Sequence, residues 1–211
     1  MNSHPLFECS NISFERDDVP LFSGVNFQIH SSQAIQVIGA NGAGKTTLLR
    51  IIAGSLTATA GDMFWRGKNI HSARGQFREQ MLYLGHNAGI KPSLTPRENL
   101  QWYFQLFPGS LESIDDALLK VSLEGYEDVS CHALSAGQQR RVGLARLYLT
   151  SALVWILDEP FTSIDVQGVA ALETLMASHL SRGGSIIMTS HQASALKGVE
   201  LIDLEKFAVV H

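Results

Sequence analysis

The stretch Gly39-Ala-Asn-Gly-Ala-Gly-Lys45-Thr46 matches the pattern G-x-x-x-x-G-K-[ST] of a phosphate-binding loop. Its glycines let the backbone turn several N–H groups toward one anion without a Cβ clash. Residues 33–38 before the loop are typical of a strand, and residues 46–53 after it carry apolar side chains at helical spacing. A strand, a glycine loop and a helix in this order predict a nucleotide site.

We expect this loop to bind a nucleotide through both its backbone and its side chains. The helix that begins near Lys45 directs the positive end of its dipole at the phosphates. Lys45 is expected to reach the β- and γ-phosphates, Thr46 to offer its hydroxyl to Mg²⁺, and Thr47 to reach the α-phosphate region. The predicted nucleotide-binding residues here are Gly39, Ala40, Asn41, Gly42, Ala43, Gly44, Lys45, Thr46 and Thr47.

Two carboxylates follow the continuous apolar run 153–157, which is typical of a parallel strand buried on both faces. Asp158 therefore stands at the end of a strand, where α/β sheets place their ligands. We expect Asp158 to hold Mg²⁺ through water, and Glu159 to orient or deprotonate the attacking water. The alternative is a solvated acidic turn before Pro160, which the phosphate loop makes the weaker interpretation.

His191 follows a second buried run, 186–188, by three residues. One interpretation is a contact to the γ-phosphate that keeps the water and Glu159 in place. The alternative is a structural histidine, because a lone histidine is more often structural than catalytic. The spacing alone does not separate the two.

The motif Leu134-Ser-Ala-Gly-Gln138 precedes a predicted helix over 136–149, with Ser135 as its expected N-cap. Ser135 and the N–H of Gly137 would meet a phosphate at this helix N-terminus. The phosphate loop already has its own dipole, lysine and metal, so a second terminus of this kind makes sense if it serves a nucleotide on another copy. A plain N-capped helix is the alternative.

The composition is that of a globular protein: 211 residues, 45% hydrophobic and 17% charged. The net charge of −4, with no basic stripe, argues against nucleic acid as a partner. We expect one domain, 1–211, with a helical insert at roughly 87–150. The other expected elements are strands within 6–38, 61–70, 81–84, 185–188 and 201–210, insert helices over 96–107 and 113–121, and a helix over 166–180.

The compartment is predicted from three features. The two cysteines, Cys9 and Cys131, lie far apart and are expected to be free thiols. The first ten residues lack the charged and apolar regions of a signal peptide. The longest apolar run, 152–157, is too short to span a bilayer. We expect a chain that is soluble and cytoplasmic, or held at a membrane by another protein.

Four motifs together resemble an ABC-type ATPase subunit, in the right order over nearly the whole chain: GANGAGKTT at 39–47, LSAGQQRRVGLAR at 134–146, LDEPFTSID at 157–165 and TSH at 189–191. The resemblance implies an α/β fold of the P-loop NTPase type. It would contain a RecA-like mixed sheet flanked by helices, an N-terminal antiparallel β subdomain and a helical subdomain. ATP hydrolysis, with ATP and Mg²⁺ as cofactors, is implied as well.

The resemblance also implies roles for single residues. Lys45, Thr46 and Thr47 look like the Walker A contacts, Asp158 like the Walker B aspartate and Glu159 like the catalytic glutamate. Ser135, Gly137 and Gln138 look like the signature residues that would close over a partner's ATP. Asp165 looks like the D-loop aspartate and His191 like the switch histidine. Two copies would therefore sandwich two ATP molecules head to tail.

Two positions depart from the family pattern. Where members usually carry an aromatic residue that stacks on adenine, this chain has Arg16, with Phe14 two residues away. Arg16 can stack through its guanidinium face, so it is the predicted base contact. Where members carry a metal-contacting glutamine after Tyr-x-x, this chain has His86 followed by Asn87. Either of them is expected to take over the metal and coupling role.

A narrower resemblance rests on the segments 84–91, 134–141 and 155–165. They are similar to the ATP-binding subunits of bacterial cytochrome c maturation (haem exporter) complexes. This implies integral membrane partners of the CcmB and CcmC type, and ATP-driven release of the haem-loaded periplasmic chaperone CcmE. It also implies a peripheral position on the cytoplasmic face of the inner membrane. The apolar stretch 100–107 is expected either to line the dock for the membrane partner or to form insert core.

Other functions remain open from the sequence. The chain could serve another ABC exporter, or act as a soluble ATP-gated clamp. A clamp would need a coiled-coil insertion, a second ATPase domain or a basic surface, and the sequence offers none of these. A small-molecule kinase would leave the motif at 134–138 unexplained.

Overall fold

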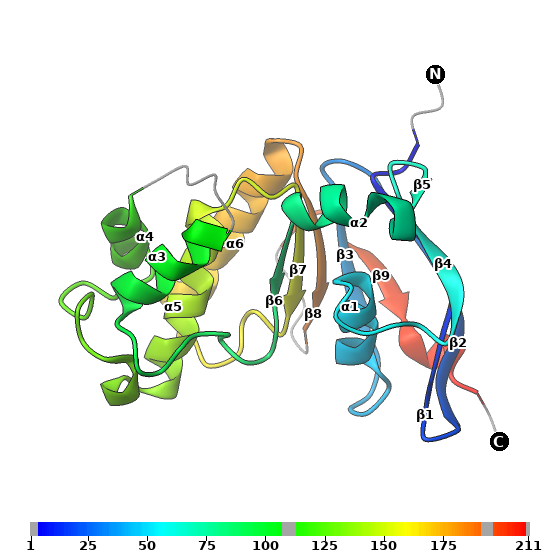
Figure 1. Cartoon of the computed structure of the whole chain (residues 1–211), viewed down its shortest axis with the longest axis horizontal. Helices are drawn as coiled ribbons and strands as arrows, with labels where there is room; N and C mark the ends of the chain where they lie inside the picture. The colour runs from blue at the N-terminus through cyan, green and yellow to red at the C-terminus, as the bar shows by residue number, and fades with distance from the viewer. Residues whose placement is uncertain (1–3, 107–112, 191–195, 210–211) are drawn as a thin grey trace.

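A computed structural model describes residues 4–106, 113–190 and 196–209 (Figure 1). The strands are β1 Phe7–Arg16, β2 Val19–Ile29, β3 Ala34–Ile38, β4 Ala60–Trp65, β5 Lys68–Asn69, β6 Met81–Leu84, β7 Val154–Asp158, β8 Ser185–Thr189 and β9 Glu200–Asp203. The α-helices are α1 Lys45–Ile52, α2 Ile70–Glu79, α3 Pro96–Leu106, α4 Ile114–Lys120, α5 Ala136–Leu149 and α6 Val166–Ser181. Two 3₁₀ turns, Cys131–Ala133 and Leu204–Phe207, complete the described elements.

The strands form two separate sheets. The central sheet has the order β6-β7-β8-β3-β9, and its neighbouring strands pair in parallel. The second sheet has the order β2-β1-β4-β5 and is antiparallel. The predicted α/β fold, with a helix-flanked core sheet and an N-terminal antiparallel sheet, is confirmed. The core sheet was expected to be mixed, but its strand pairs among the described residues are all parallel, and the antiparallel pairs lie in the second sheet.

Strand β7 illustrates how the sequence produces two cores. Because successive side chains of a strand point to opposite faces, Val154 and Ile156 face one way and Trp155 and Leu157 the other. The first pair packs in a cluster with α1 and the antiparallel sheet, and the second pair in a cluster with α5 and α6. In Figure 1, α1 accordingly lies between the two sheets, with α5 and α6 beyond the opposite face of the central sheet.

Helix α1 fits this space because its apolar side chains Leu48, Leu49, Ile51 and Ile52 are all buried. Its N-cap is Gly44, whose φ of +97° suits a residue without a Cβ. A Cβ at Gly44 would lie 2.8 Å from the Leu21 side chain of β2. The glycine therefore lets the phosphate loop rest directly on the antiparallel sheet.

The region 87–150 contains the predicted helices. It contains α3, α4 and α5, and α5 occupies the predicted range 136–149. A third apolar cluster, which includes Leu100, Leu118 and Leu149, lies within this region. However, α5 also contributes Leu144 and Leu147 to the cluster against the central sheet. The division of the chain into a domain with an insert at 87–150 stays a prediction.

Two predicted strand ends are wrong. The segment 61–70 is expected to form a strand pair with a turn at Gly67-Lys68, and β4 and β5 do form an antiparallel pair, but Ile70 begins the helix α2. Helix α2 is mostly polar, and its buried residues are Ala73 and Phe77, so the apolar periodicity was too weak to indicate a helix. At the other end, β9 pairs with β3 at the sheet edge as expected, but the chain turns into a 3₁₀ helix at Leu204.

Both cysteines are free and buried, as expected. Burial raises the pKa of the Cys9 thiol well above its ordinary value, and burial also raises that of Cys131. Neither thiol is therefore a reactive thiolate at neutral pH. Across the described residues, no helix is both long and apolar enough to cross a membrane.

A buried histidine lies against the strand that carries the carboxylates. The ring of His179 in α6 stacks on Trp155, with centroids 3.8 Å apart and planes 9° from parallel. Gly184 leaves room for it, because a Cβ there would lie 2.2 Å from the ring. Burial lowers the pKa of His179 from 6.5 to about 4. The ring is therefore neutral in the folded protein at neutral pH.

We predict that this histidine makes the fold acid-sensitive. Between pH 6.5 and 4 the unfolded chain binds a proton at His179 that the folded chain does not, so the free energy of unfolding falls with falling pH. From pH 7 to pH 5 the loss should be about 2 kcal/mol. The check is urea unfolding at both pH values for the wild-type chain and for His179→Phe. The variant should lack this part of the loss; an identical pH dependence would contradict the assignment.

Candidate active site

The phosphate loop lies between β3 and α1, as its sequence predicted. The Lys45 side chain is nearly buried, and its Nζ donates to the carbonyl oxygens of Gly39 (2.7 Å) and Ala40 (3.0 Å). The N–H of Ala40 donates to Glu205 Oε1 at 2.8 Å, so the loop is also held by the C-terminal 3₁₀ helix. The ammonium group is thus fixed at the mouth of a loop that precedes a helix N-terminus, where phosphate groups bind.

Asp158 lies against the phosphate loop, although 112 residues separate it from Thr46. Thr46 Oγ1 donates to Asp158 Oδ1 at 3.1 Å, and Thr189 Oγ1 donates to the same oxygen at 2.7 Å. The other oxygen, Oδ2, is buried and has no hydrogen-bond partner among the described residues. A buried carboxylate oxygen without a partner, beside a hydroxyl group, fits a hard cation such as Mg²⁺.

Glu159 occupies a strained backbone conformation at the end of β7. Its φ is +50°, a left-handed region that costs a residue with a side chain about 1–2 kcal/mol. Three hydrogen bonds hold it there. Its N–H donates to Thr189 Oγ1 at 2.9 Å, and its carbonyl oxygen accepts from Arg140 Nη2 at 2.9 Å and from the Thr162 N–H at 3.2 Å. Such strain persists where the surroundings over-determine the backbone, which is common at active sites.

The motif at 134–138 forms the capped N-terminus of α5. Ser135 Oγ accepts from the Gln138 N–H, and Gln138 Oε1 accepts from the Ser135 N–H, which together make a capping box. The Ser135 hydroxyl still has its own proton to donate. Gly137 lies close to the turn after β7, since a Cβ there would lie 3.0 Å from the Ser163 carbonyl oxygen. The expected N-cap at Ser135 is confirmed.

Asp165 connects this helix to α6. Its Oδ1 accepts from the Gly168 N–H at 2.8 Å and caps α6, while its Oδ2 pairs with Arg141 of α5. The Gly168 hydrogen bond, together with the Arg141 charge, holds the pKa of Asp165 below its ordinary value. The predicted D-loop aspartate therefore links the signature helix and α6 within one chain.

The side chains of three further predicted residues are not joined to this cluster. Arg16 is exposed at the end of β1, with its Nε 3.8 Å from the Asp17 carboxylate, while Phe14 packs toward Phe22. His86 and Asn87 are exposed, and His86 belongs to no potential metal-binding group of three or more His, Cys, Asp or Glu residues in the described part of the chain. The roles of Arg16, His86 and Asn87 stay predictions. His191 lies outside the described residues.

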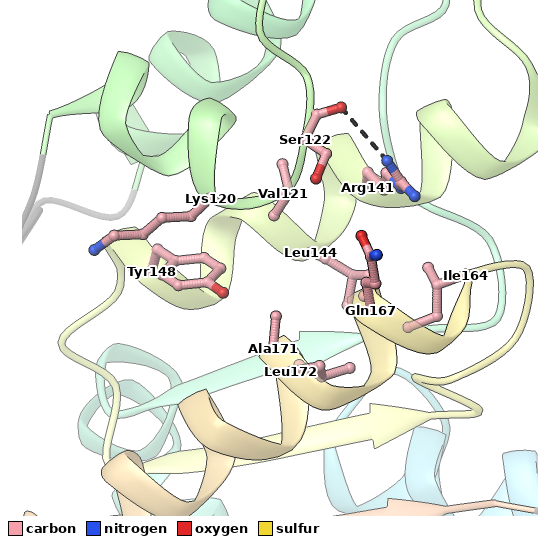
Figure 2. A pocket seen from close by; sticks show the side chains of 11 residues that line it. Lys120, Val121, Ser122, Arg141, Leu144, Tyr148, Ile164, Gln167, Ala171 and Leu172 are labelled. Carbon is pink, nitrogen blue, oxygen red and sulfur yellow. Dashed lines mark hydrogen bonds between the residues drawn. The ribbon is translucent and has the colours of Figure 1, made fainter.

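A hollow of about 220 Å³ lies between α4, α5 and α6, away from the phosphate loop (Figure 2). Its lining is mostly apolar, including Leu144 and Leu172, and Arg141 donates to the Ser122 carbonyl oxygen at its rim. The helical region is thus incompletely packed against α6 at this point.

Two contributors to the site were missed from the sequence. Thr189, at the end of β8, bonds to both carboxylate residues and pairs with Asp158 in the parallel register. Its position directly after the apolar run 186–188 was a usable signal. Arg140 is nearly buried and donates to four carbonyl oxygens of the site. The first arginine in Gln-Gln-Arg-Arg gave no signal, because a charged residue on a helix is usually exposed.

A family model described as "ABC transporter" matches residues 22–162, which is more than half of the chain. The chain belongs to the ABC transporter family. It is one of the ATP-hydrolysing subunits of that family, and the nucleotide it binds is ATP. The match covers the phosphate loop, the motif at 134–138 and the two carboxylates.

Similar ABC proteins are found among both sequences and structures. The cytochrome c biogenesis ATP-binding export protein CcmA of Hahella chejuensis is 48% identical over 195 residues, which are 92% of each chain. A putative ABC transporter ATP-binding protein from Pyrococcus furiosus matches with a TM-score of 0.81 at 23% identity, over 96% of this chain and 99% of that one. A dimeric ATP-binding cassette with bound ADP and Pi has a TM-score of 0.77 at 20% identity, over 88% of each chain. These structures share the ABC fold.

Proposed function

We propose that this chain is the ATP-hydrolysing subunit of a membrane complex for cytochrome c maturation. The observation that carries the proposal is the 48% identity to a CcmA protein over 92% of both chains. The geometry supports the chemical part, because Lys45, Thr46 and Asp158 converge on one edge of the central sheet. Hydrolysis of ATP at this edge would drive the complex.

In this proposal each residue of the site has one task. Lys45 and the backbone N–H groups at 39–47 bind the phosphates of ATP, and Glu159 accepts a proton from the attacking water. Thr46 and the unpartnered oxygen of Asp158 would hold Mg²⁺, which neutralises phosphate charge when bound. His191 would contact the γ-phosphate, Arg16 would stack on adenine, and His86 or Asn87 would contact the metal.

The site is proposed to be completed by a second copy of the chain. The N–H of Gly137 and the free hydroxyl proton of Ser135 lie at the N-terminus of α5, whereas the phosphate loop lies at the N-terminus of a different helix, α1. We infer that these groups, with Gln138, bind the ATP held by the other copy. Closure of two chains would then form two complete sites, and hydrolysis would reopen them.

The membrane partners in this proposal are integral subunits of the CcmB and CcmC type, docked near residues 86–107. Trp102 supports this dock: it is 39% exposed, and Lys91 Nζ lies 4.0 Å from its ring centroid. The hollow between α5 and α6 leaves room for the helical insert to turn as the dimer closes. The chain would then lie on the cytoplasmic face of the inner membrane, and its cycle would release haem-loaded CcmE.

The test is purification of the tagged chain from membranes of its own cells. We expect integral membrane subunits to co-purify in detergent and to raise its ATPase rate, and a charge reversal at Lys91 to weaken both effects. The matched control is a charge reversal at Lys68, on the antiparallel sheet. A chain recovered without any membrane protein, and with the same ATPase rate in membranes as alone, would contradict the proposal.

A further inference from the structure

Arg140 bridges two segments of the site that are far apart in sequence. From α5, its Nη1 donates to the carbonyl oxygens of Gly85 (2.6 Å) and His86 (3.1 Å), in the loop after β6. Its Nη2 donates to the carbonyl oxygens of Asp158 (3.1 Å) and Glu159 (2.9 Å). Only 5% of the residue is exposed, so one planar guanidinium group holds both segments in a nearly dry environment.

The same face of α5 holds more of the loop after β6. Residues 140, 143 and 146 follow one another at a spacing of three, so each lies beside the next on the helix surface. A Cβ at Gly143 would lie 2.8 Å from the Ala88 carbonyl oxygen, and Arg146 Nη2 donates to the Gly89 carbonyl oxygen. Helix α5 therefore packs against the backbone of the loop 85–89 and is hydrogen-bonded to it through two arginine side chains.

Glu159 lies at the other end of this bridge. Its left-handed backbone is held from β8 by Thr189, from α5 by Arg140, and within its own turn by the Thr162 N–H, which donates to its carbonyl oxygen. The Thr189 contact stays within the central sheet, whereas the Arg140 contact comes from the helical region. A shift of α5 relative to the sheet would therefore pull on the Glu159 carbonyl group and turn its carboxylate.

We propose that Arg140 is a positioning residue that couples the loop 85–89 and helix α5 to the catalytic carboxylate of Glu159 within one chain. The inference rests on the proposed role of Glu159 and adds the route by which the loop reaches it. The route runs through backbone carbonyl groups, so it does not depend on the side chain at position 86. Arginine suits the task because its rigid fork can serve two pairs of acceptors at once, which a lysine ammonium cannot.

The test compares Arg140→Met and Arg140→Lys with the wild-type full-length chain. A displacement of a catalytic group by about 1 Å can lower the rate by about 100-fold. We expect Arg140→Met to lower kcat by about 100-fold and Arg140→Lys by about tenfold, with KM for ATP changed less than about threefold. The control is Arg182→Met, at the exposed C-terminus of α6, which should keep the wild-type kcat.

A double-mutant cycle separates positioning from a general loss of structure. If Arg140 acts through the Glu159 carboxylate, Arg140→Met should change the residual rate of a Glu159→Gln chain by less than about threefold. ATP binding by the Glu159→Gln chain should also survive the second substitution. Additive losses of rate in the cycle, a parallel loss of ATP affinity, or an unchanged kcat in both Arg140 variants would each overturn the inference. A wild-type chain that neither binds nor hydrolyses ATP would instead overturn the proposed function.

Discussion

Replacing Glu159 with glutamine is expected to lower ATP hydrolysis by about 1,000-fold while ATP binding is kept. A positioned general base contributes about 10²–10⁴-fold to rate, and glutamine cannot accept the proton. The substitution keeps the size of the side chain. It also leaves the N–H and carbonyl contacts to Thr189 and Arg140 in place, so the strained backbone should not relax.

The measurement is phosphate release under saturating ATP, together with the Kd of a fluorescent ATP analogue. Glu124→Gln, which changes an exposed glutamate in the helical region, is the matched control and should hydrolyse ATP at the wild-type rate. Unchanged turnover in Glu159→Gln would remove this carboxylate from the mechanism.

The second large effect is expected at Lys45. Lys45→Ala should weaken ATP binding by about 100-fold, because it removes a charge-assisted hydrogen bond to the phosphates worth up to about 3 kcal/mol. It also removes the two bonds that fix the loop at Gly39 and Ala40. Titration with ATP and Mg²⁺ measures the change directly.

Lys68→Ala is the control for that titration, since Lys68 is exposed on β5 of the antiparallel sheet and far in sequence from the loop. It should bind ATP as the wild-type chain does. Normal affinity in Lys45→Ala would contradict the assignment of the phosphate loop itself.

The strands and helices that were predicted well are those whose burial is complete or regular. The apolar run 153–157 is fully buried in β7, and Ser135 caps α5 as its hydroxyl chemistry predicts. Helix α2 was missed because it lies at the surface and its burial rests on Ala73 and Phe77. In such a helix, packing on the neighbouring sheet stabilises a segment whose own pattern is mostly polar.

The residues of the site also differ in whether the sequence could predict them. Lys45, Thr46 and Asp158 carry recognisable chemistry at recognisable spacing, and the structure brings all three together. Arg140 could not be predicted, because its function depends on four backbone carbonyl groups that come from two distant loops. Only the fold determines where main-chain acceptors converge, and a sequence pattern does not record it.

The structure also explains why the signature motif is ambiguous in one chain. Ser135, Gly137 and Gln138 form an ordinary capped helix terminus, and Asp165 makes contacts within its own chain. These contacts are compatible both with a plain helix start and with a phosphate site supplied to a second copy. The assembly state therefore has to be measured.

The most direct measurement is the mass of the Glu159→Gln chain by light scattering, with and without ATP and Mg²⁺. We expect the 23.1-kDa mass of one chain without nucleotide and twice that mass with it. Adding Ser135→Arg to the same chain should keep ATP binding but prevent the doubling, because the partner's phosphate would meet a bulky side chain at the helix N-terminus. A Glu159→Gln chain that stays at the single-chain mass when saturated with ATP would contradict the composite site.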